Sequence, residues 1–177
     1  MIEIEKRGLL AVEEYNELLS FLDAHAKNLG EDNKEIVYYI YDDKLLKVVS
    51  NLSKNSAKIS LKMNKLGDGV ATLETEVEFD SHDYSKMKYI IDIIGKAPQA
   101  IEGIQKRKNF IYKDCEIAMK WSKDYGYHFE IEKVTEDSNE VKELEKEIDS
   151  VLEDLKIVAM TNDEIKEFQK KIEEAAK

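Results

Sequence analysis

The chain alternates between apolar and polar residues over most of its length, which is the pattern of β-strands. In residues 2–7, Ile2 and Ile4 share one face of an extended segment. The opposite face of that segment carries Glu3, Glu5 and Arg7. The same period predicts further strands over residues 35–41, 45–52, 57–66, 70–79, 101–112, 115–121 and 125–134. About eight strands joined as hairpins favour an antiparallel sheet.

Other segments follow a helical period instead. The spacing of their apolar residues predicts helices over 12–29, 82–94, 141–155 and 162–172. Gly30 is expected to end the first helix, and Ser81 is expected to cap the second. Helices inserted among so many antiparallel strands predict an α+β fold, an antiparallel β-barrel or tunnel of about eight strands with flanking helices. Residues 1–177 are expected to form a single domain.

Composition narrows the class of protein. Charged residues make up 37% of the chain, and the net charge is −11, which argues against nucleic-acid binding by bulk electrostatics and against anionic membranes. Cys115 has no partner for an internal disulfide, which fits a reducing compartment. The N-terminal residues do not form a signal peptide, and no apolar run approaches the roughly 20 residues that span a bilayer. The sequence therefore predicts a cytoplasmic protein.

Charged side chains recur on one face of strand after strand. These faces carry Glu3, Glu5 and Arg7; Lys58, Ser60 and Lys62; Glu74, Glu76 and Glu78; Lys106 and Lys108; Glu116 and Lys120; and His128, Glu130 and Glu132. Each face alone is typical of a solvated side of an antiparallel sheet. A closed barrel with its helices outside would instead turn all of them into a lumen. Alternation alone does not decide between these two interpretations.

Several of these residues form an ordered set of motifs that resembles the CYTH superfamily, the triphosphate tunnel metalloenzymes. Residues 3–7 are similar to its opening E-x-E-x-K signature, with arginine in the last place. The stretch YGYHFEIEKV, residues 125–134, resembles its last strand, and an amphipathic helix follows. The family also has counterparts of Lys62, Glu74, Glu76, Lys106 and Lys108. The family includes small bacterial adenylate cyclases, thiamine triphosphatases and inorganic triphosphatases.

Two positions depart from the family pattern. Lys47 is the best match where the family commonly has a pair of arginines, and Lys120 stands where it commonly has an aspartate. A cation in place of a carboxylate on the metal side weakens the case for two metal ions, and lost arginine forks reduce bidentate phosphate recognition. The helix expected over 12–29 is also longer than the family's usual opening.

The resemblance implies a function and a set of site residues. It implies metal-dependent hydrolysis of a small triphosphate, which could be inorganic triphosphate, thiamine triphosphate or a nucleoside triphosphate. The phosphates would lie on Arg7, Lys62, Lys106 and Lys108. Mg²⁺ or Mn²⁺ would lie on Glu3, Glu5, Glu74, Glu76, Glu130 and Glu132. The residues implied to be catalytic are Glu3, Glu5, Glu130 and Glu132.

Two alternatives stay open beside hydrolysis: a triphosphate- or polyanion-binding module with degenerate catalysis, and an adenylate cyclase. In each case the partner is a small phosphorylated ligand, without nucleic acid or membrane, bound by a monomer or homodimer. If the barrel closes between its first and last strands, the pair Glu3 and Glu5 should meet the pair Glu130 and Glu132. Lys120 would then neutralise part of that cluster.

Overall fold

The computed structural model describes residues 1–63 and 69–175, and these form a sheet of nine strands with four α-helices. The strands are β1 (Ile2–Leu9), β2 (Lys27–Glu31), β3 (Lys34–Ile40), β4 (Leu45–Asn51), β5 (Ser56–Lys62), β6 (Ala71–Asp80), β7 (Gln99–Tyr112), β8 (Cys115–Ser122) and β9 (Gly126–Thr135). The helices are α1 (Val12–His25), α2 (Tyr84–Ile94), α3 (Val141–Leu155) and α4 (Asn162–Ala175), with a 3₁₀ turn η1 (Ser81–Asp83) before α2.

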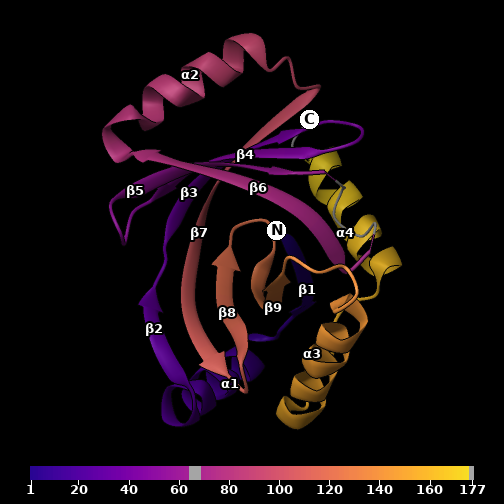
Figure 1. The fold of residues 1–177 in the computed structure, drawn as a ribbon. Coiled ribbons are helices and arrows are strands. Elements are labelled where there is room, and N and C mark those ends of the chain that lie inside the picture. The colour runs from indigo at the N-terminus through magenta and orange to yellow at the C-terminus, as the bar shows by residue number, and fades with distance from the viewer. Residues whose placement is uncertain (64–68, 176–177) are drawn as a thin grey trace.

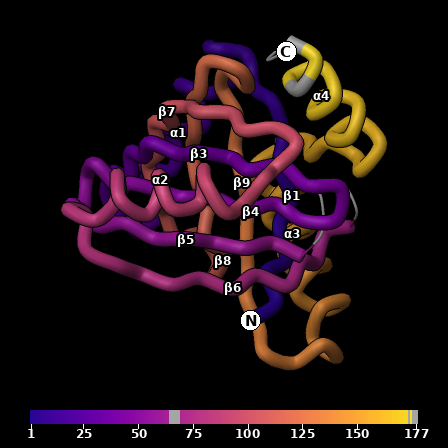
Figure 2. Tube along the Cα trace, turned by 90° about the horizontal axis from the view of Figure 1, so that it is seen from above, coloured from indigo at the N-terminus to yellow at the C-terminus, as the bar shows by residue number. Residues whose placement is uncertain are grey.

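Eight of the strands close into an antiparallel barrel. Their order is β7-β3-β4-β5-β6-β1-β9-β8, and β8 pairs back with β7, while β2 adds an extra strand on β7. The first and last strands lie side by side (Figures 1 and 2). In their register Glu5 stands opposite Glu132, and Arg7 stands opposite Glu130. The predicted α+β barrel and its closure between β1 and β9 are both confirmed.

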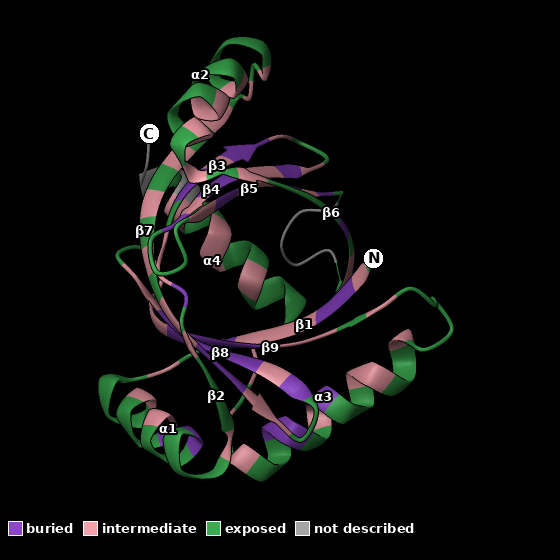
Figure 3. Ribbon diagram, turned by 60° about the vertical axis from the view of Figure 1, so that its left-hand side comes forward, coloured by how far each residue is buried: buried purple, intermediate pink, exposed green. Residues whose placement is uncertain are grey.

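Apolar side chains on the outer face of the barrel pack onto the helices in two places. Around β1, β8 and β9, the fully buried Ile4, Ile117 and Phe129 pack with residues of α1 and α3 such as Leu22 and Ile148. On the other side of the barrel, the apolar residues of β3 and β4 pack under α2. Figure 3 shows the buried positions gathered where helices face strands. Because the apolar faces are used in this way, the charged faces line the interior, as the lumen interpretation predicts.

A glycine near the end of β1 lets a later segment cross the strand. β1 pairs with β6 only over Ile2–Ile4, so its second half has a free edge on that side. The main-chain amide of Met160 donates to the carbonyl of Arg7 over 2.8 Å and covers this edge. A Cβ on Gly8 would lie 2.5 Å from the carbonyl oxygen of Val158, so glycine permits the approach. The backbone of Arg7 is thereby held from both sides.

Three element boundaries differ from the prediction. Residues 27–31 form β2 instead of continuing the first helix, with Gly30 at φ +89° beside a bulge against β7. The side chain of Asp80, not that of Ser81, accepts from the amide of His82 and caps the 3₁₀ turn that precedes α2. The strand expected over 57–66 ends at Lys62, and residues 64–66 lie outside the described residues. None of the described helices has the length and apolar character needed to cross a bilayer.

Candidate functional site

The barrel encloses a cavity of about 1040 Å³ that is lined by charged side chains from all eight of its strands. Residues of α4 also line it, and Phe168 of this helix packs edge-on against Tyr125, with ring centroids 5.0 Å apart. The charged residues of the barrel strands in the wall include Glu3, Glu5, Arg7, Lys34, Lys47, Lys58, Lys62, Glu74, Glu76, Arg107, Lys120, Glu130 and Glu132. Carboxylates and cations therefore face the same enclosed space.

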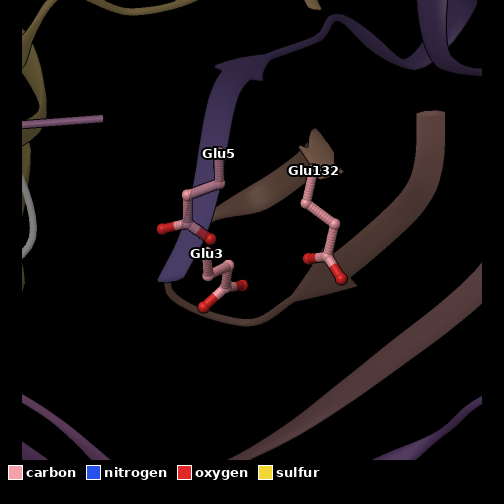
Figure 4. Close-up of side chains that lie close together, drawn as sticks. All are labelled: Glu3, Glu5 and Glu132. Atoms are coloured by element: carbon pink, nitrogen blue, oxygen red, sulfur yellow. The ribbon is translucent and has the colours of Figure 1, made fainter. Parts of the chain in front are cut away.

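Three carboxylates gather where β1 meets β9, and we call Glu3, Glu5 and Glu132 the carboxylate trio. One oxygen from each lies within 4.8 Å of the others. Figure 4 shows Glu3 and Glu5 projecting from one strand toward the side chain of Glu132 on its neighbour. The strand register produces this arrangement, because Glu5 and Glu132 are cross-strand partners and Glu3 lies two residues further along the same face.

Burial disfavours the ionised form of all three carboxyl groups in the trio. Burial, the hydrogen bond with Glu74 and the charge of Glu5 raise the pKa of Glu3 to about 9. Burial also raises the pKa of Glu132. Burial acts in the same direction on Glu5, but the neighbouring cations Arg7 and Lys62 outweigh it and lower the pKa of that carboxyl. An added cation would therefore stabilise the ionised forms of Glu3 and Glu132, the two acids of the trio with raised pKa values.

A single ammonium is shared among several of these acids. The Nζ atom of Lys62 lies 2.7 Å from Glu3, 3.4 Å from Glu5 and 3.5 Å from Glu74. Glu74 is fixed independently, since its Oε1 accepts from the hydroxyl of Ser60 and from Lys47 over 3.1 Å. Burial works against ionisation of Glu74, yet its hydrogen bond with Glu3 and these cations lower its pKa. Glu74 therefore holds two lysines and borders the trio at Glu3.

Glu130 lies beside the trio in sequence but has different partners. Its Oε1 is 3.3 Å from Nη1 of Arg7, and its Oε2 is ion-paired with the ammonium of Lys120. Lys120 is 4% exposed and Glu130 is 7% exposed, so this pair is deeply buried. Burial, the nearby Arg107 and the other cations lower the pKa of Lys120 to about 8, despite the opposing pull of Glu130.

His128 completes this part of the wall. Its Nδ1 is 3.0 Å from the carbonyl oxygen of Gly126, which accepts hydrogen bonds, so Nδ1 carries the proton and Nε2 keeps its lone pair. Burial and the charge of Lys120 lower the pKa of the imidazole to about 4. The ring is therefore neutral at physiological pH.

Cations prevail around the loop that leads into β3. The carboxylate of Asp32 lies 2.7 Å from Lys34, 3.1 Å from Lys54 and 3.7 Å from Nε of Arg107. These cations and the amide of Asn51 lower the pKa of Asp32 against the effect of its burial. Arg107 also reaches Glu116, over 3.1 Å, so its guanidinium spans the distance between β3 and β8.

The structure brings together most, but not all, of the residues expected in the site. Glu76 lies in the cavity wall and is paired with Lys58 over 2.5 Å, away from the trio. Lys106 borders the cavity, whereas the expectation that Lys108 faces the interior is wrong. Lys106 is exposed, with its ammonium 5.6 Å from the ring of Trp121, and Lys108 reaches out to Asp23 of α1 over 2.7 Å.

Arg107 points into the interior, whereas Lys108 points away from it. The sequence contains the signal that separates them, because Phe110 shares a strand face with Lys106 and Lys108 and is itself fully buried in the helix-packed core. Sequence reasoning also missed two cavity residues, Asp32 in the loop before β3 and Lys34 at the start of that strand.

Comparison with solved structures shows that distant proteins share this fold. PH1012 from Pyrococcus horikoshii OT3 matches with a TM-score of 0.70 at 20% identity, over 92% of this chain and 99% of that one. A Hippeastrum protein assigned as an adenylyl cyclase, and described as having a dominant triphosphatase activity, matches with a TM-score of 0.60 at 18% identity, over 89% of each chain. The Mimivirus capping enzyme triphosphatase matches with a TM-score of 0.51 at 13% identity, over 87% of this chain and 88% of that one.

No protein-family model matches the chain, and no curated protein matches it in sequence. The structural likenesses confirm the barrel fold that the sequence predicts. At such low identities the likeness concerns the fold, and the activities belong to those other proteins.

Proposed function

We propose that the tunnel binds a small triphosphate together with a divalent cation and hydrolyses its terminal phosphoryl group. The observation that carries the proposal is the meeting of the carboxylate trio with several buried cations in one enclosed cavity. A polyanion needs the cations, and a hard metal ion needs the carboxylates. The triphosphatases that share the fold support the same choice of ligand.

The trio fits a hard divalent ion such as Mg²⁺ or Mn²⁺. Such ions take carboxylate oxygens as ligands, and three of these oxygens lie within 4.8 Å of one another in the cavity wall. Glu3, Glu5 and Glu132 would hold the ion, which when bound would neutralise phosphate charge and polarise water. Of the six carboxylates expected to bind metal, we assign this role to these three, since their oxygens converge on one point, whereas Glu76 and Glu130 are paired elsewhere, with Lys58 and Lys120.

The phosphate chain would lie on the cations that line the cavity. We assign this role to Arg7, Lys62 and Arg107, with Lys34 and Lys58 as further contacts, and not to Lys108. In hydrolysis, the oxygen of a water molecule forms a bond to the terminal phosphorus while the bond to the bridging oxygen breaks. The buried cations hold the charge on the phosphoryl oxygens during this transfer, and the enclosed wall limits access of bulk water.

An assay panel tests the proposal. Inorganic triphosphate, thiamine triphosphate and ATP are each incubated with Mg²⁺ or Mn²⁺, and the products are scored for orthophosphate and for cyclic AMP. We expect orthophosphate from at least one substrate and loss of this release with EDTA. Cyclic AMP from ATP would favour the cyclase instead.

A binding module without catalysis is the second candidate, and the Lys120–Glu130 ion pair favours it because this pair removes one carboxylate from the metal side. Calorimetric titration of inorganic triphosphate separates the two. Binding without orthophosphate release would favour the module, and absence of both binding and release would reject a triphosphate function.

A further inference from the structure

The buried pair of Lys120 and Glu130 divides the acidic side of the tunnel into two unlike halves. In one half, the carboxylate trio shares its cations among several acids. In the other half, each oxygen of Glu130 faces a cation: Oε1 faces Arg7, which Glu130 shares with Glu5, and Oε2 faces Lys120. An ion-paired carboxylate of this kind can bind a metal only if a buried cation gives up its partner.

The surroundings of Lys120 make this half unsuited to a divalent ion. The groups that act most strongly on the Lys120 ammonium are Arg107, Glu130 and Arg7, two of them cations. On β8, the neighbouring carboxylate Glu116 is also occupied, by Arg107 over 3.1 Å and by the amide of Asn109 over 2.9 Å. A divalent ion placed here would lie among fixed positive charges and find its candidate ligands already paired.

We propose, on the basis of the function proposed above, that the ammonium of Lys120 takes the place of a second divalent ion and limits the tunnel to one. Glu130 is then a positioning residue, which holds Lys120 and Arg7 against the cavity wall. The ligand would meet one divalent ion on the trio and two fixed cations on Glu130. The Lys120 ammonium is part of the cavity lining, which gives it access to a bound phosphate.

The number of bound Mn²⁺ ions measures this directly. Titration of the apo protein with Mn²⁺, followed by the electron paramagnetic resonance of the free ion, should give one tight site per chain. Lys120→Glu replaces the ammonium with a carboxylate beside Glu130, and it should raise the count to two. Lys120→Met removes the charge without adding a ligand and should keep the count at one. Lys108→Glu, on the outer face of β7, is the matched control for an added acid and should also keep one.

Two further variants separate a ligand from a positioning residue. Glu5→Gln should weaken the Mn²⁺ affinity by at least about tenfold, as expected for the loss of a direct carboxylate ligand. Glu130→Gln should leave the Mn²⁺ affinity within about threefold while weakening the binding of inorganic triphosphate by about tenfold or more, because Lys120 and Arg7 lose their anchor. Circular dichroism verifies that each variant is folded.

The outcomes distinguish this inference from the proposed function. Two Mn²⁺ ions in the unaltered protein would overturn the inference and leave the proposed function standing. Absence of Mn²⁺ binding in the unaltered protein would reject the metal-dependent function itself. One ion in both the unaltered protein and a folded Lys120→Glu variant would show that Lys120 does not set the number. If Lys120→Glu does not fold, two measurements still test the inference. These are the number of Mn²⁺ ions bound by the unaltered protein and the effects of Glu130→Gln on the affinities for Mn²⁺ and triphosphate.

Discussion

The two sides of the tunnel wall differ in their prevailing charge. Strands β3 to β5 contribute lysines to the cavity, namely Lys34, Lys47, Lys58 and Lys62. Strands β1 and β9 contribute Glu3, Glu5, Glu130 and Glu132, with Arg7 among them. The lysines reach toward acids of other strands, as Lys62 does toward Glu3 over 2.7 Å and Lys58 toward Glu76 over 2.5 Å.

This contrast explains how a highly charged interior can be stable without a ligand. Each wall neutralises the other, so few charges are left without a partner of opposite sign. A phosphate that enters must replace a carboxylate as the partner of a lysine. A metal ion can then bind the carboxylates that the lysines release. Metal and phosphate are therefore expected to help each other bind, each by taking the partners that the other displaces.

The acidic wall should give the largest effect when it is altered. Glu5→Gln keeps the shape of the side chain and removes one charge from the carboxylate trio, which would hold the metal. We expect metal-dependent release of orthophosphate to fall by about 100-fold or more, as for other losses of transition-state charge stabilisation. Steady-state assay with inorganic triphosphate checks this. Glu78→Gln, at an exposed position of β6, is the control and should keep full activity. Equal activity in both variants would contradict the role of the trio.

Substitution in the basic wall should give the second-largest effect, a loss of affinity for inorganic triphosphate. Arg107 faces the cavity and Lys108, the next residue, faces α1, so alanine at each position makes a matched pair. Arg107→Ala should weaken the binding of inorganic triphosphate by about 1.5–3 kcal/mol, the contribution of a charge-assisted hydrogen bond. Lys108→Ala should leave the affinity nearly unchanged. Isothermal titration of both variants measures the difference. A larger loss of affinity for Lys108→Ala would indicate that triphosphate binds on the opposite face of β7.

The neighbouring residues Arg107 and Lys108 also show what could be predicted from the sequence and what could not. Alternation predicted β1 and β9 correctly because Ile2, Ile4, Phe129 and Ile131 all lie on the face opposite the glutamates, which leaves one consistent register. In β7 three consecutive cations, Lys106 to Lys108, satisfy either register. The buried Phe110 resolves the choice, but its burial depends on the helices that cover it.

Two other features depend on tertiary structure in the same way. The residues of β2 have no apolar alternation and become a strand because β7 offers them a partner. The ion pair of Lys120 with Glu130 is a diagonal contact between neighbouring strands, since Glu130 stands directly opposite Ala118. Such a contact requires the exact register of β8 against β9, which residue patterns do not specify.

The coupling between the two walls should be measurable as a third, smaller effect. If the ligands exchange partners as described, saturating Mn²⁺ should tighten the binding of inorganic triphosphate by about tenfold, within the usual range of coupling free energies. Triphosphate should tighten Mn²⁺ binding by the same factor, because linkage is reciprocal. Titrating each ligand with and without the other gives both numbers. Mn²⁺ alone should raise the melting temperature and EDTA should reverse the rise. Independent binding of the two would contradict the exchange of partners.

The smallest effect concerns His128, which lies on the acidic wall beside the cation that neutralises Glu130. Its burial and the charge of Lys120 lower the pKa of the imidazole to about 4 in the folded protein, below the ordinary value of 6.5. As pH falls below 6.5, the His128 imidazole is protonated in the unfolded chain but stays neutral in the folded chain. The folded state therefore loses stability progressively toward pH 4. From these two values the loss between pH 7 and pH 5 should be about 1–2 kcal/mol.

Variants at two histidines separate this contribution from that of the carboxylates. His128→Gln retains a side-chain donor for the Gly126 carbonyl but cannot be protonated, so its unfolding free energy should fall by about 1–2 kcal/mol less between pH 7 and pH 5. His82→Gln, at an exposed position in η1, should lose as much stability as the unaltered protein. Urea unfolding at both pH values measures all three. Equal losses in the unaltered protein and His128→Gln would mean that the imidazole accepts its proton in the folded state, and that the wall around Lys120 tolerates more positive charge than its ion pairs indicate.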